Sequence, residues 1–384
     1  MRRLEEYISA GGKRLRLGYT TGTCAAAATR AAAELLLSGN LVASVDVHTP
    51  ADIDILVDVE EASSGPGWAC CAVRKDAGDD PDVTDGVLVY ARVSLQDEPD
   101  CTILGGRGVG RVTRAGLDQP VGEAAINSVP REMISRAALD CAREHGYDGG
   151  LSVEICIPAG VELARRTFNP RLGIEGGISV LGTSGIVRPM SEEALIASIR
   201  LELKVLRATG ATDVLVVPGN YGRDFASGTL HLSLDKSVTC SNYLGETIDE
   251  AGLLGFGTML VVGHVGKLVK VAAGVMNTHS RVADCRVEVL AAHAALAGAS
   301  QRVVRQVMEA ATTDAVVDIL WEEGLFEQTM ASITRRIGEH LTHRSADGLR
   351  VEAVMFSNQH GLLGATSGAE GLFARHMQGK AQDA

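Results

Sequence analysis

The sequence is short of aromatic residues and of positive charge. Phe, Trp and Tyr make up only 4% of the 384 residues, so apolar burial falls mainly to aliphatic side chains and alanine. Lys and Arg number 36 against 48 Asp and Glu, which gives a formal net charge of −12. Because binding to nucleic acid or to an anionic membrane surface needs a basic surface, this deficit argues against both as partners.

Long apolar runs and paired cysteines are missing too. No stretch of about 18 residues is apolar enough to span a membrane, and the start, MRRLEEYISAGGKRLR, has no apolar signal-peptide core. The eight cysteines form neither a C-x-x-C pair nor a zinc spacing with histidine. We therefore predict a cytoplasmic protein with reduced thiols and no protein-bound metal. The sequence leaves a homo-oligomer open.

Hydrophobic residues, at 46%, and glycine, at 44 residues, are plentiful, and a chain of this length predicts two domains. Residues 1–160 hold short β-rich segments separated by Gly, Pro and Asp turns, which indicates a two-layer α+β domain. In residues 161–364 strands alternate with helices, which predicts a Rossmann-like, doubly wound α/β domain with a helical C-terminal part. Residues 365–384 are expected to form a frayed tail.

Three helices have end signals or apolar stripes in the sequence. An alanine-rich helix has Thr23 as its expected N-cap and ends at Gly39. A second runs from Ser191 to about Ala208. A third is indicated by an apolar stripe that begins at Val282.

A glycine-rich turn, GTSG at residues 182–185, precedes the helix at Ser191. It matches neither the dinucleotide fingerprint nor the P-loop, because no Lys-Ser or Lys-Thr follows it. Glu192 and Glu193 in the first turn of the helix would repel a phosphate at that place. The turn is therefore either a plain strand-to-helix connection or a contact for a ligand without phosphate, including a cationic one.

Two further turns follow buried strands, PGN at residues 218–220 and GH at residues 263–264. Parallel α/β sheets bind ligands at the carboxyl ends of their strands, so both turns are candidates for ligand contact. GHVGK is not a P-loop, since its glycines are too close together and Leu268 replaces the required hydroxyl. His264 is either a ligand-contacting residue or a solvent-facing loop histidine.

Charge is distributed unevenly along the chain. The segment KDAGDDPDVTDG, residues 75–86, lacks the spacing and the closing glutamate of a calcium loop, so turns are the simpler interpretation. Binding a cation or polarising a substrate group stays open for this segment. Three basic, glycine-rich stretches, residues 101–117, 163–174 and 251–283, contain no carboxylate. Their cations are either solvated or form a pocket for a polyanion, because guanidinium groups bind carboxylates bidentately. Three such stretches in an acidic chain favour the pocket.

Long motifs throughout residues 16–300 resemble the cobalt-precorrin-5B C1-methyltransferase family of anaerobic corrin biosynthesis, the CbiD type. They are LGYTTGTCAAAATRAA, KDAGDDPDVTDG, GGRGVGRVTRAGL, VGEAAINSVPREMI, TFNPRLGIEGGISVLGTSGIVRPMSEEA, VPGNYG and GHVGKLVKVAAGVMNTHSRVADCRVE. The resemblance implies methyl transfer from S-adenosylmethionine to C1 of a cobalt-bearing tetrapyrrole, which gives cobalt-precorrin-6A. The cobalt would arrive in the substrate, and the carboxylate arms of the tetrapyrrole fit the basic stretches.

The resemblance supplies no residue roles, so the site is predicted from the residues alone. His264 and His279 are candidate general bases because imidazole titrates near neutral pH, and His279 alternatively helps to begin the helix after Ser280. The predicted cofactor contacts are the turn residues Thr183, Ser184, Gly185, Gly219, Asn220 and Gly263. The predicted substrate contacts, expected between the domains, are Arg107, Arg188, Lys267, Lys270, Lys75 and Asp79.

Two other functions stay open on the sequence. A nucleotide-dependent phosphotransferase would use the glycine-rich turns, although the P-loop is missing. A non-catalytic corrinoid-binding protein would bind the macrocycle without a second ligand.

Overall fold

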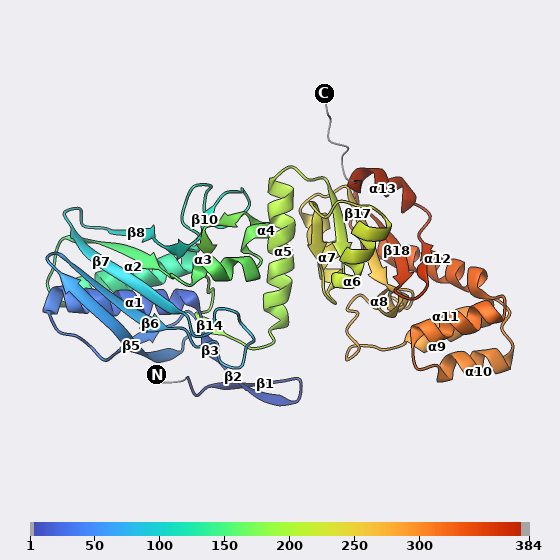
Figure 1. Cartoon of the computed structure of the whole chain (residues 1–384), viewed down its shortest axis with the longest axis horizontal. Helices are drawn as coiled ribbons and strands as arrows, with labels where there is room; N and C mark the ends of the chain where they lie inside the picture. The colour runs from blue at the N-terminus through green and yellow to red at the C-terminus, as the bar shows by residue number, and fades with distance from the viewer. Residues whose placement is uncertain (1–3, 378–384) are drawn as a thin grey trace, which may run out of the picture. The chain divides into compact units, whose positions relative to one another are not determined.

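The computed structural model describes residues 4–377 and divides into two compact units between Glu192 and Glu193 (Figure 1). The division lies later than the boundary at residue 160 that the sequence indicated. Residues 174–187 form short strands that pair with strands of the first unit, and they hold this segment there. The pairs are β12 (Ile174–Glu175) with β10 (Arg111–Val112), β13 (Gly177–Ile178) with β9 (Gly108–Val109), and β14 (Ile186–Val187) with β3 (Gly18–Tyr19).

The first unit is built on a six-stranded sheet in the order β4-β5-β6-β7-β11-β8. Neighbouring strands are antiparallel except β11 and β8, which are parallel. These strands are the β-rich segments that the sequence indicated within residues 1–160. Their bounds are β4 (Ser44–His48), β5 (Asp54–Gly65), β6 (Trp68–Arg74), β7 (Leu88–Gln96), β8 (Cys101–Gly105) and β11 (Gly150–Cys156). The hairpin of β1 (Tyr7–Ala10) and β2 (Lys13–Arg16) precedes them.

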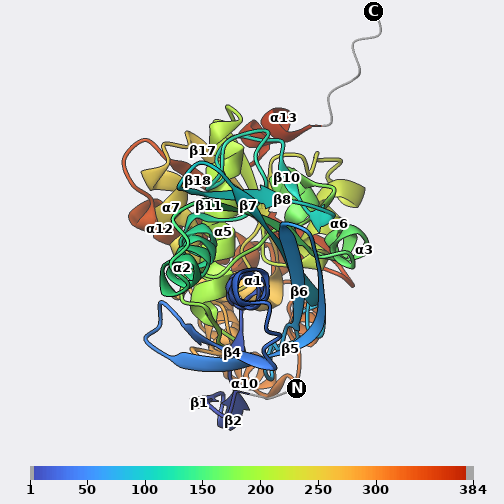
Figure 2. The same cartoon turned by 90° about the vertical axis from the view of Figure 1, so that its left-hand side faces the viewer.

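Two helices, α1 (Thr21–Ser38) and α2 (Ser128–Glu144), pack against each other and against this sheet. Figure 2 looks nearly along α1 and shows β4, β5 and β6 curling around it. The sheet can approach closely because the buried face of α1 consists mainly of alanines. Its N-cap is Thr20 rather than Thr23, whereas the predicted end at Gly39 is confirmed. Three short helical segments complete the unit: α3 (Gly160–Leu163), η1 (Ala164–Arg166) and α4 (Asn169–Leu172).

Replacing Gly108 by alanine is expected to destabilise the first unit strongly. Gly108 has φ +79°, and a Cβ there would lie 1.8 Å from the carbonyl oxygen of Ile157. Gly122 has φ +94° but open space around the same position, so it is the matched control. Gly122→Ala should lower the free energy of unfolding by about 1–2 kcal/mol, because of the left-handed backbone alone. Gly108→Ala should lower it by more, and urea unfolding measures both. Equal losses would mean that the contact with Ile157 relaxes freely.

The second unit contains a five-stranded sheet in the order β16-β15-β17-β18-β19. Its first four strands are parallel, and β19 is antiparallel to β18. Alternate residues of β15 enter different cores, with Val214 and Val216 on one face and Leu215 and Val217 on the other, so the sheet is covered on both sides. The bounds are β15 (Asp213–Val217), β16 (Ser237–Thr239), β17 (Thr258–His264), β18 (Arg350–Ser357) and β19 (Gly361–Ala365).

Helices cover both faces of this sheet. The larger core, on the face of Val214 and Val216, contains apolar residues of several helices. They are α5 (Glu192–Ala208), α7 (Leu244–Leu253), α8 (Val265–Val271), α9 (Arg286–Leu296), α10 (Gln301–Glu309), α11 (Thr313–Glu322) and α12 (Phe326–Arg344). The smaller core, on the other face, contains apolar residues of η2 (Phe225–Thr229) and of α13 (Glu370–His376). The short helix α6 (Asn220–Asp224) directly precedes η2. In the described part of the chain, no helix is both long and apolar enough to cross a membrane.

Two predictions about helices need correction. The frayed tail was placed too early, because residues 370–376 form α13 and bury Leu372 and His376; residues 378–384 lie outside the described range. The helix expected from Val282 begins only at Arg286, after Cys285 in a left-handed conformation with φ 38°. Val282 itself is exposed.

Candidate functional site

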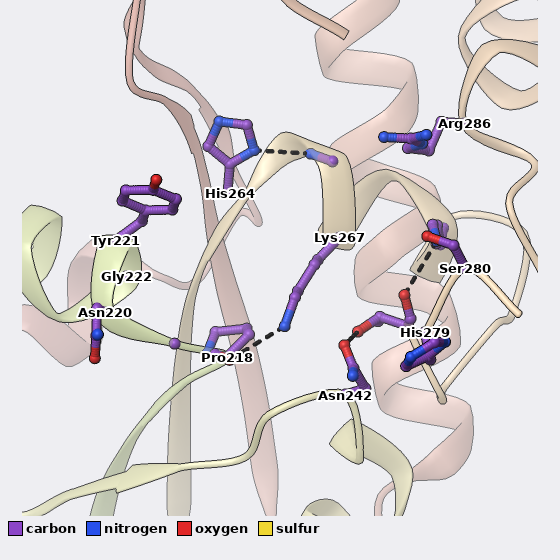
Figure 3. Close-up of a pocket in the computed structure, with 14 residues that line it drawn as sticks. Pro218, Asn220, Tyr221, Gly222, Asn242, His264, Lys267, His279, Ser280 and Arg286 are labelled. Atoms are coloured by element: carbon purple, nitrogen blue, oxygen red, sulfur yellow. Dashed lines mark hydrogen bonds between the residues drawn. The ribbon is translucent and has the colours of Figure 1, made fainter. Parts of the chain in front are cut away.

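A pocket of about 440 Å³ lies where β15 and β17 end in the second unit (Figure 3). Its volume falls within the usual range of small-molecule sites, about 300–1,000 Å³. The pocket brings together six residues that the sequence predicted for the site: Gly219, Asn220, His264, Lys267, Lys270 and His279. The other lining residues are Pro218, Tyr221, Gly222, Asn242, Gly266, Thr278, Ser280 and Arg286.

Lys267 ties together two loops at this edge of the sheet. Its Nζ donates hydrogen bonds to the carbonyl oxygen of Pro218 at 3.2 Å and to that of Ser241 at 3.0 Å. Pro218 follows β15 and Ser241 follows β16, so one ammonium group fixes the relative position of both strand ends. Burial lowers the pKa of Lys267 below its usual range. Lys267 therefore holds the two loops in place and also contributes a positive charge to the wall of the pocket.

His264 is the last residue of β17 and the N-cap of α8. Its Nδ1 accepts a hydrogen bond from the backbone N–H of Gly266 at 3.1 Å, which Figure 3 draws as a dashed line. The neutral ring therefore carries its hydrogen on Nε2 and can donate from that atom. Burial lowers the pKa of His264. This geometry gives a neutral donor, and taking up a proton on Nδ1 would break the helix cap.

His264→Asn is expected to weaken the pH dependence of stability. The unfolded imidazole titrates near its ordinary pKa of about 6.5, and the lowered pKa in the folded chain means that the unfolded state takes up its proton first as the pH falls. The contribution of neutral His264 to the free energy of unfolding is thus fully present above about pH 6.5, and it is lost as the pH falls through the folded-state pKa. Asparagine caps helices well but does not titrate in this range.

Urea unfolding at about pH 8 and about pH 5 measures this effect, and the variant should lose less stability than the parent protein between the two. His343→Asn, at an exposed position in α12, is the matched control and should follow the parent. Parallel losses for parent and His264→Asn would contradict the capping role.

A buried lysine holds the loop on the other side of the pocket. Lys270 is only 1% exposed, and its Nζ donates to the carbonyl oxygen of Thr278 at 3.0 Å and lies 3.5 Å from Ser280 Oγ and 3.8 Å from Asp284 Oδ1. Burial lowers the pKa of this ammonium group. The backbone N–H of Thr278 in turn donates to Asn242 at 2.9 Å. These contacts fix the segment that carries His279.

His279 is exposed at the rim of the pocket. Its Nδ1 accepts a hydrogen bond from the backbone N–H of Arg281 at 3.1 Å. The neutral ring therefore also carries its hydrogen on Nε2. Both histidines that the sequence named as candidate bases are thus held as donors on their outer nitrogen.

Among the lining residues that the sequence did not predict are Tyr221, Asn242 and Arg286. Tyr221 is 65% exposed, and its ring centroid lies 6.5 Å from that of His264. Arg286 begins α9 and pairs with Asp284 at 2.6 Å. Asn242 follows β16. Tyr221 and Arg286 lie within quoted motifs, VPGNYG and GHVGKLVKVAAGVMNTHSRVADCRVE, whereas Asn242 lies in none.

The GTSG turn at residues 182–185 belongs to the first unit, whereas the sequence placed it in the domain of residues 161–364. It sits on the N-terminal end of α1, where the carbonyl oxygen of Gly185 accepts from Thr23 Oγ1 at 2.7 Å and from the backbone N–H of Thr20 at 3.0 Å. Thr183, Ser184 and Gly185 therefore belong to the first unit. Gly263 does lie next to His264, inside β17, where its missing side chain leaves room for Leu268 of α8.

Four predicted substrate contacts also belong to the first unit. Arg107 and Arg188 are exposed there. Lys75 is 2% exposed, and its Nζ binds Asp82 Oδ2 at 2.6 Å. Asp79 Oδ2 accepts from the backbone N–H of Arg16 at 2.7 Å. The last two side chains therefore stabilise the 75–86 loop.

Comparison with known proteins gives a consistent picture for both units. A family model described as CbiD matches residues 8–189, and a second, described as the CbiD C-terminal domain, matches residues 277–367. A protein of Ruminiclostridium cellulolyticum named cobalt-precorrin-5B C(1)-methyltransferase is 50% identical over 355 residues, which cover 92% of each chain. A protein of Alkaliphilus metalliredigens with the same name is 43% identical over 366 residues, 95% of this chain and 96% of its own.

One solved structure is also similar. It is the crystal structure of a cobalamin biosynthesis protein (cbiD) from Archaeoglobus fulgidus, with 29% sequence identity. The match covers 73% of this chain and 87% of that chain, at a TM-score of 0.40.

Proposed function

This chain belongs to the CbiD family, and on that premise we propose that it transfers a methyl group to C1 of cobalt-precorrin-5B, which gives cobalt-precorrin-6A. We propose S-adenosylmethionine as the methyl donor. The C1–methyl bond forms as the bond between sulfur and the methyl group breaks, and S-adenosylhomocysteine leaves. Cobalt enters as part of the substrate.

One observation carries the placement of ligands in the second-unit pocket, namely its charge. Lys267, Lys270 and Arg286 line it, and no Asp or Glu is among the described lining residues. The nearest carboxylate partner of these cations is Asp284, which pairs with Arg286. A pocket of this kind suits ligands with carboxylate groups. The carboxylate arms of the tetrapyrrole and the carboxylate of the methyl donor both meet that condition.

We place the methyl donor toward Gly219, Asn220 and Tyr221. Gly219 has open space where a side chain would lie, so the backbone there can be approached closely. The exposed ring of Tyr221 offers an apolar face to an adenine base. The macrocycle would then lie toward Lys267 and Lys270. Holding both reactants in one geometry is the main contribution expected of the protein.

The two histidines have a revised role in this proposal. His264 and His279 each accept a backbone hydrogen bond on Nδ1, so each offers an N–H donor on Nε2. We therefore propose that they donate to oxygen atoms of the ligands, in place of the general-base role considered from the sequence. We also propose that the second unit is a Rossmann-like doubly wound domain, which its four parallel strands and its helices on both faces support.

The test is to incubate the protein with methyl-labelled S-adenosylmethionine and purified cobalt-precorrin-5B. We expect a single labelled methyl group on C1, located by mass spectrometry and NMR. Binding of Mg-ATP without binding of S-adenosylmethionine would instead favour the phosphotransferase. Binding of the macrocycle with no transfer of label would favour a non-catalytic corrinoid-binding protein.

A further inference from the structure

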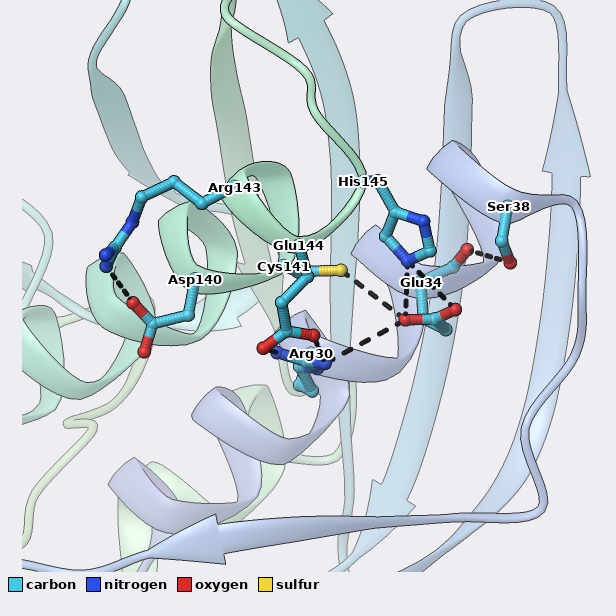
Figure 4. Close-up of polar contacts among 8 residues, drawn as sticks. All are labelled: Arg30, Glu34, Ser38, Asp140, Cys141, Arg143, Glu144 and His145. Atoms are coloured by element: carbon cyan, nitrogen blue, oxygen red, sulfur yellow. Dashed lines mark hydrogen bonds and ion pairs between the residues drawn. The ribbon is translucent and has the colours of Figure 1, made fainter.

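Three side chains with metal-binding atoms meet between the two helices of the first unit (Figure 4). Glu34 lies on the last turns of α1, Cys141 lies on α2, and His145 is the C-cap of α2. Cys141 and His145 stand four residues apart and so share one face of their helix. One carboxylate oxygen, the thiol sulfur and one imidazole nitrogen all lie within 4.8 Å of one another.

The distances between these atoms are close to those around a tetrahedral zinc ion. Nε2 of His145 lies 3.1 Å and 3.0 Å from the two oxygens of Glu34, and Cys141 Sγ lies 3.7 Å from Oε2. Bonds of about 2.0–2.3 Å from zinc to nitrogen, oxygen and sulfur, at tetrahedral angles, separate the donor atoms by about 3.3–3.6 Å. The separations from Glu34 to the other two donors therefore differ from these values by a few tenths of an ångström, and the third separation, between Cys141 and His145, is within 4.8 Å.

The surroundings also suit a divalent cation. Arg30 lies 3.9 Å from Glu34 Oε2, but its guanidinium forms a two-pronged ion pair with Glu144, so its charge is already compensated. That leaves the Glu34 carboxylate and the Cys141 thiolate to balance two positive charges.

A cavity in the same unit opens onto the Glu34 side of the cluster. A cavity of about 370 Å³ is lined by Arg30, Glu34, Val42, Ser44, Val45 and Asp46. A cation can therefore enter at the Glu34 carboxylate and leave room for a water molecule. The acidic side chain of Asp46 at this opening favours entry of positive charge.

We propose that Glu34, Cys141 and His145 bind a zinc-class divalent cation, with water as the fourth ligand. The site ties the C-terminal end of α1 to that of α2. Binding forms a metal–sulfur bond and breaks the S–H bond of Cys141, whose proton passes to solvent. The proposal is independent of methyl transfer, since every ligand lies in the first unit and outside the pocket described above.

Titration of the full chain with Co²⁺ after treatment with a chelator tests the site. We expect one equivalent to bind with the strong near-ultraviolet absorption of a cobalt–thiolate bond and the visible bands of tetrahedral cobalt. Zn²⁺ should displace the cobalt, bleach the spectrum and raise the thermal midpoint of unfolding. Absence of the thiolate band in the parent protein would overturn the proposal.

Variants separate this cluster from the other seven cysteines. Cys141→Ser should abolish the thiolate band, and His145→Gln should weaken Co²⁺ binding by more than about tenfold. Cys101→Ser, at a partly buried cysteine of the same unit, and His48→Gln, at an exposed histidine, are matched controls that should bind like the parent. An unchanged band in Cys141→Ser, with the circular dichroism of the folded protein, would show adventitious cobalt on another thiol and overturn the assignment.

Discussion

Replacing Lys267 by methionine is expected to lower kcat/KM for methyl transfer by about two orders of magnitude. The ammonium group donates to the carbonyl oxygens of Pro218 and Ser241, and methionine fills similar space without a donor. Both carbonyls then lose their partner, and the loops after β15 and β16 are no longer fixed to each other. A displacement of about 1 Å in a site that positions two reactants is enough for a loss of this size.

The measurement is steady-state transfer of label, with urea unfolding to check that the variant is folded. Lys204→Met, at an exposed position on α5, is the matched control in the same unit and should retain full turnover. Lys267→Arg should recover part of the activity, since arginine keeps the charge and the donors but not the shape. If the Lys267→Met variant is folded and has the kcat/KM of the parent protein, Lys267 does not position the reactants.

Asp76→Ala is expected to destabilise the first unit by about 3–5 kcal/mol. Asp76 is 3% exposed and binds Arg16 with both oxygens, at 2.6 Å to Nη1 and 2.7 Å to Nη2. Its Oδ1 also accepts from the backbone N–H of Gly78 at 3.0 Å. In the parent protein, the hydrogen bond with Asp76 raises the pKa of Arg16. The variant would leave this half-buried guanidinium without its main partner.

The control for Asp76→Ala is Asp140→Ala, which breaks the exposed pair between Asp140 and Arg143 on α2. Exposed pairs contribute only about 0–1 kcal/mol. Urea unfolding of both variants at neutral pH should therefore separate them by several kcal/mol. Similar losses for the two variants would show that solvent reaches Arg16 easily.

Much of the fold could be predicted from the sequence because its main elements have strong periodic patterns. The strands β15 and β17 are continuous apolar runs, as expected for parallel strands buried on both faces. Gly39 and the alanines of α1 mark a helix by composition and by its cap. The pocket at the strand ends followed from the same pattern, since ligands bind at the carboxyl ends of such strands.

The rest depends on contacts between residues that lie far apart in the sequence. The strands that hold residues 174–187 in the first unit are only two residues long, which is too short for any periodicity. The sequence therefore placed residues 161–187 in the second domain, whereas they belong to the first unit. Likewise, Glu34 and Cys141 are separated by 107 residues, so no spacing rule could join them.

The sheet of the second unit has a consequence for the order in which the chain is made. β18 lies directly beside β17, yet it begins at Arg350, long after β17 ends at His264. During translation, one edge of β17 therefore stays unpaired while α8 to α12 are synthesised. Its second neighbour is made only after these helices, so the nascent chain exposes an apolar strand edge throughout their synthesis.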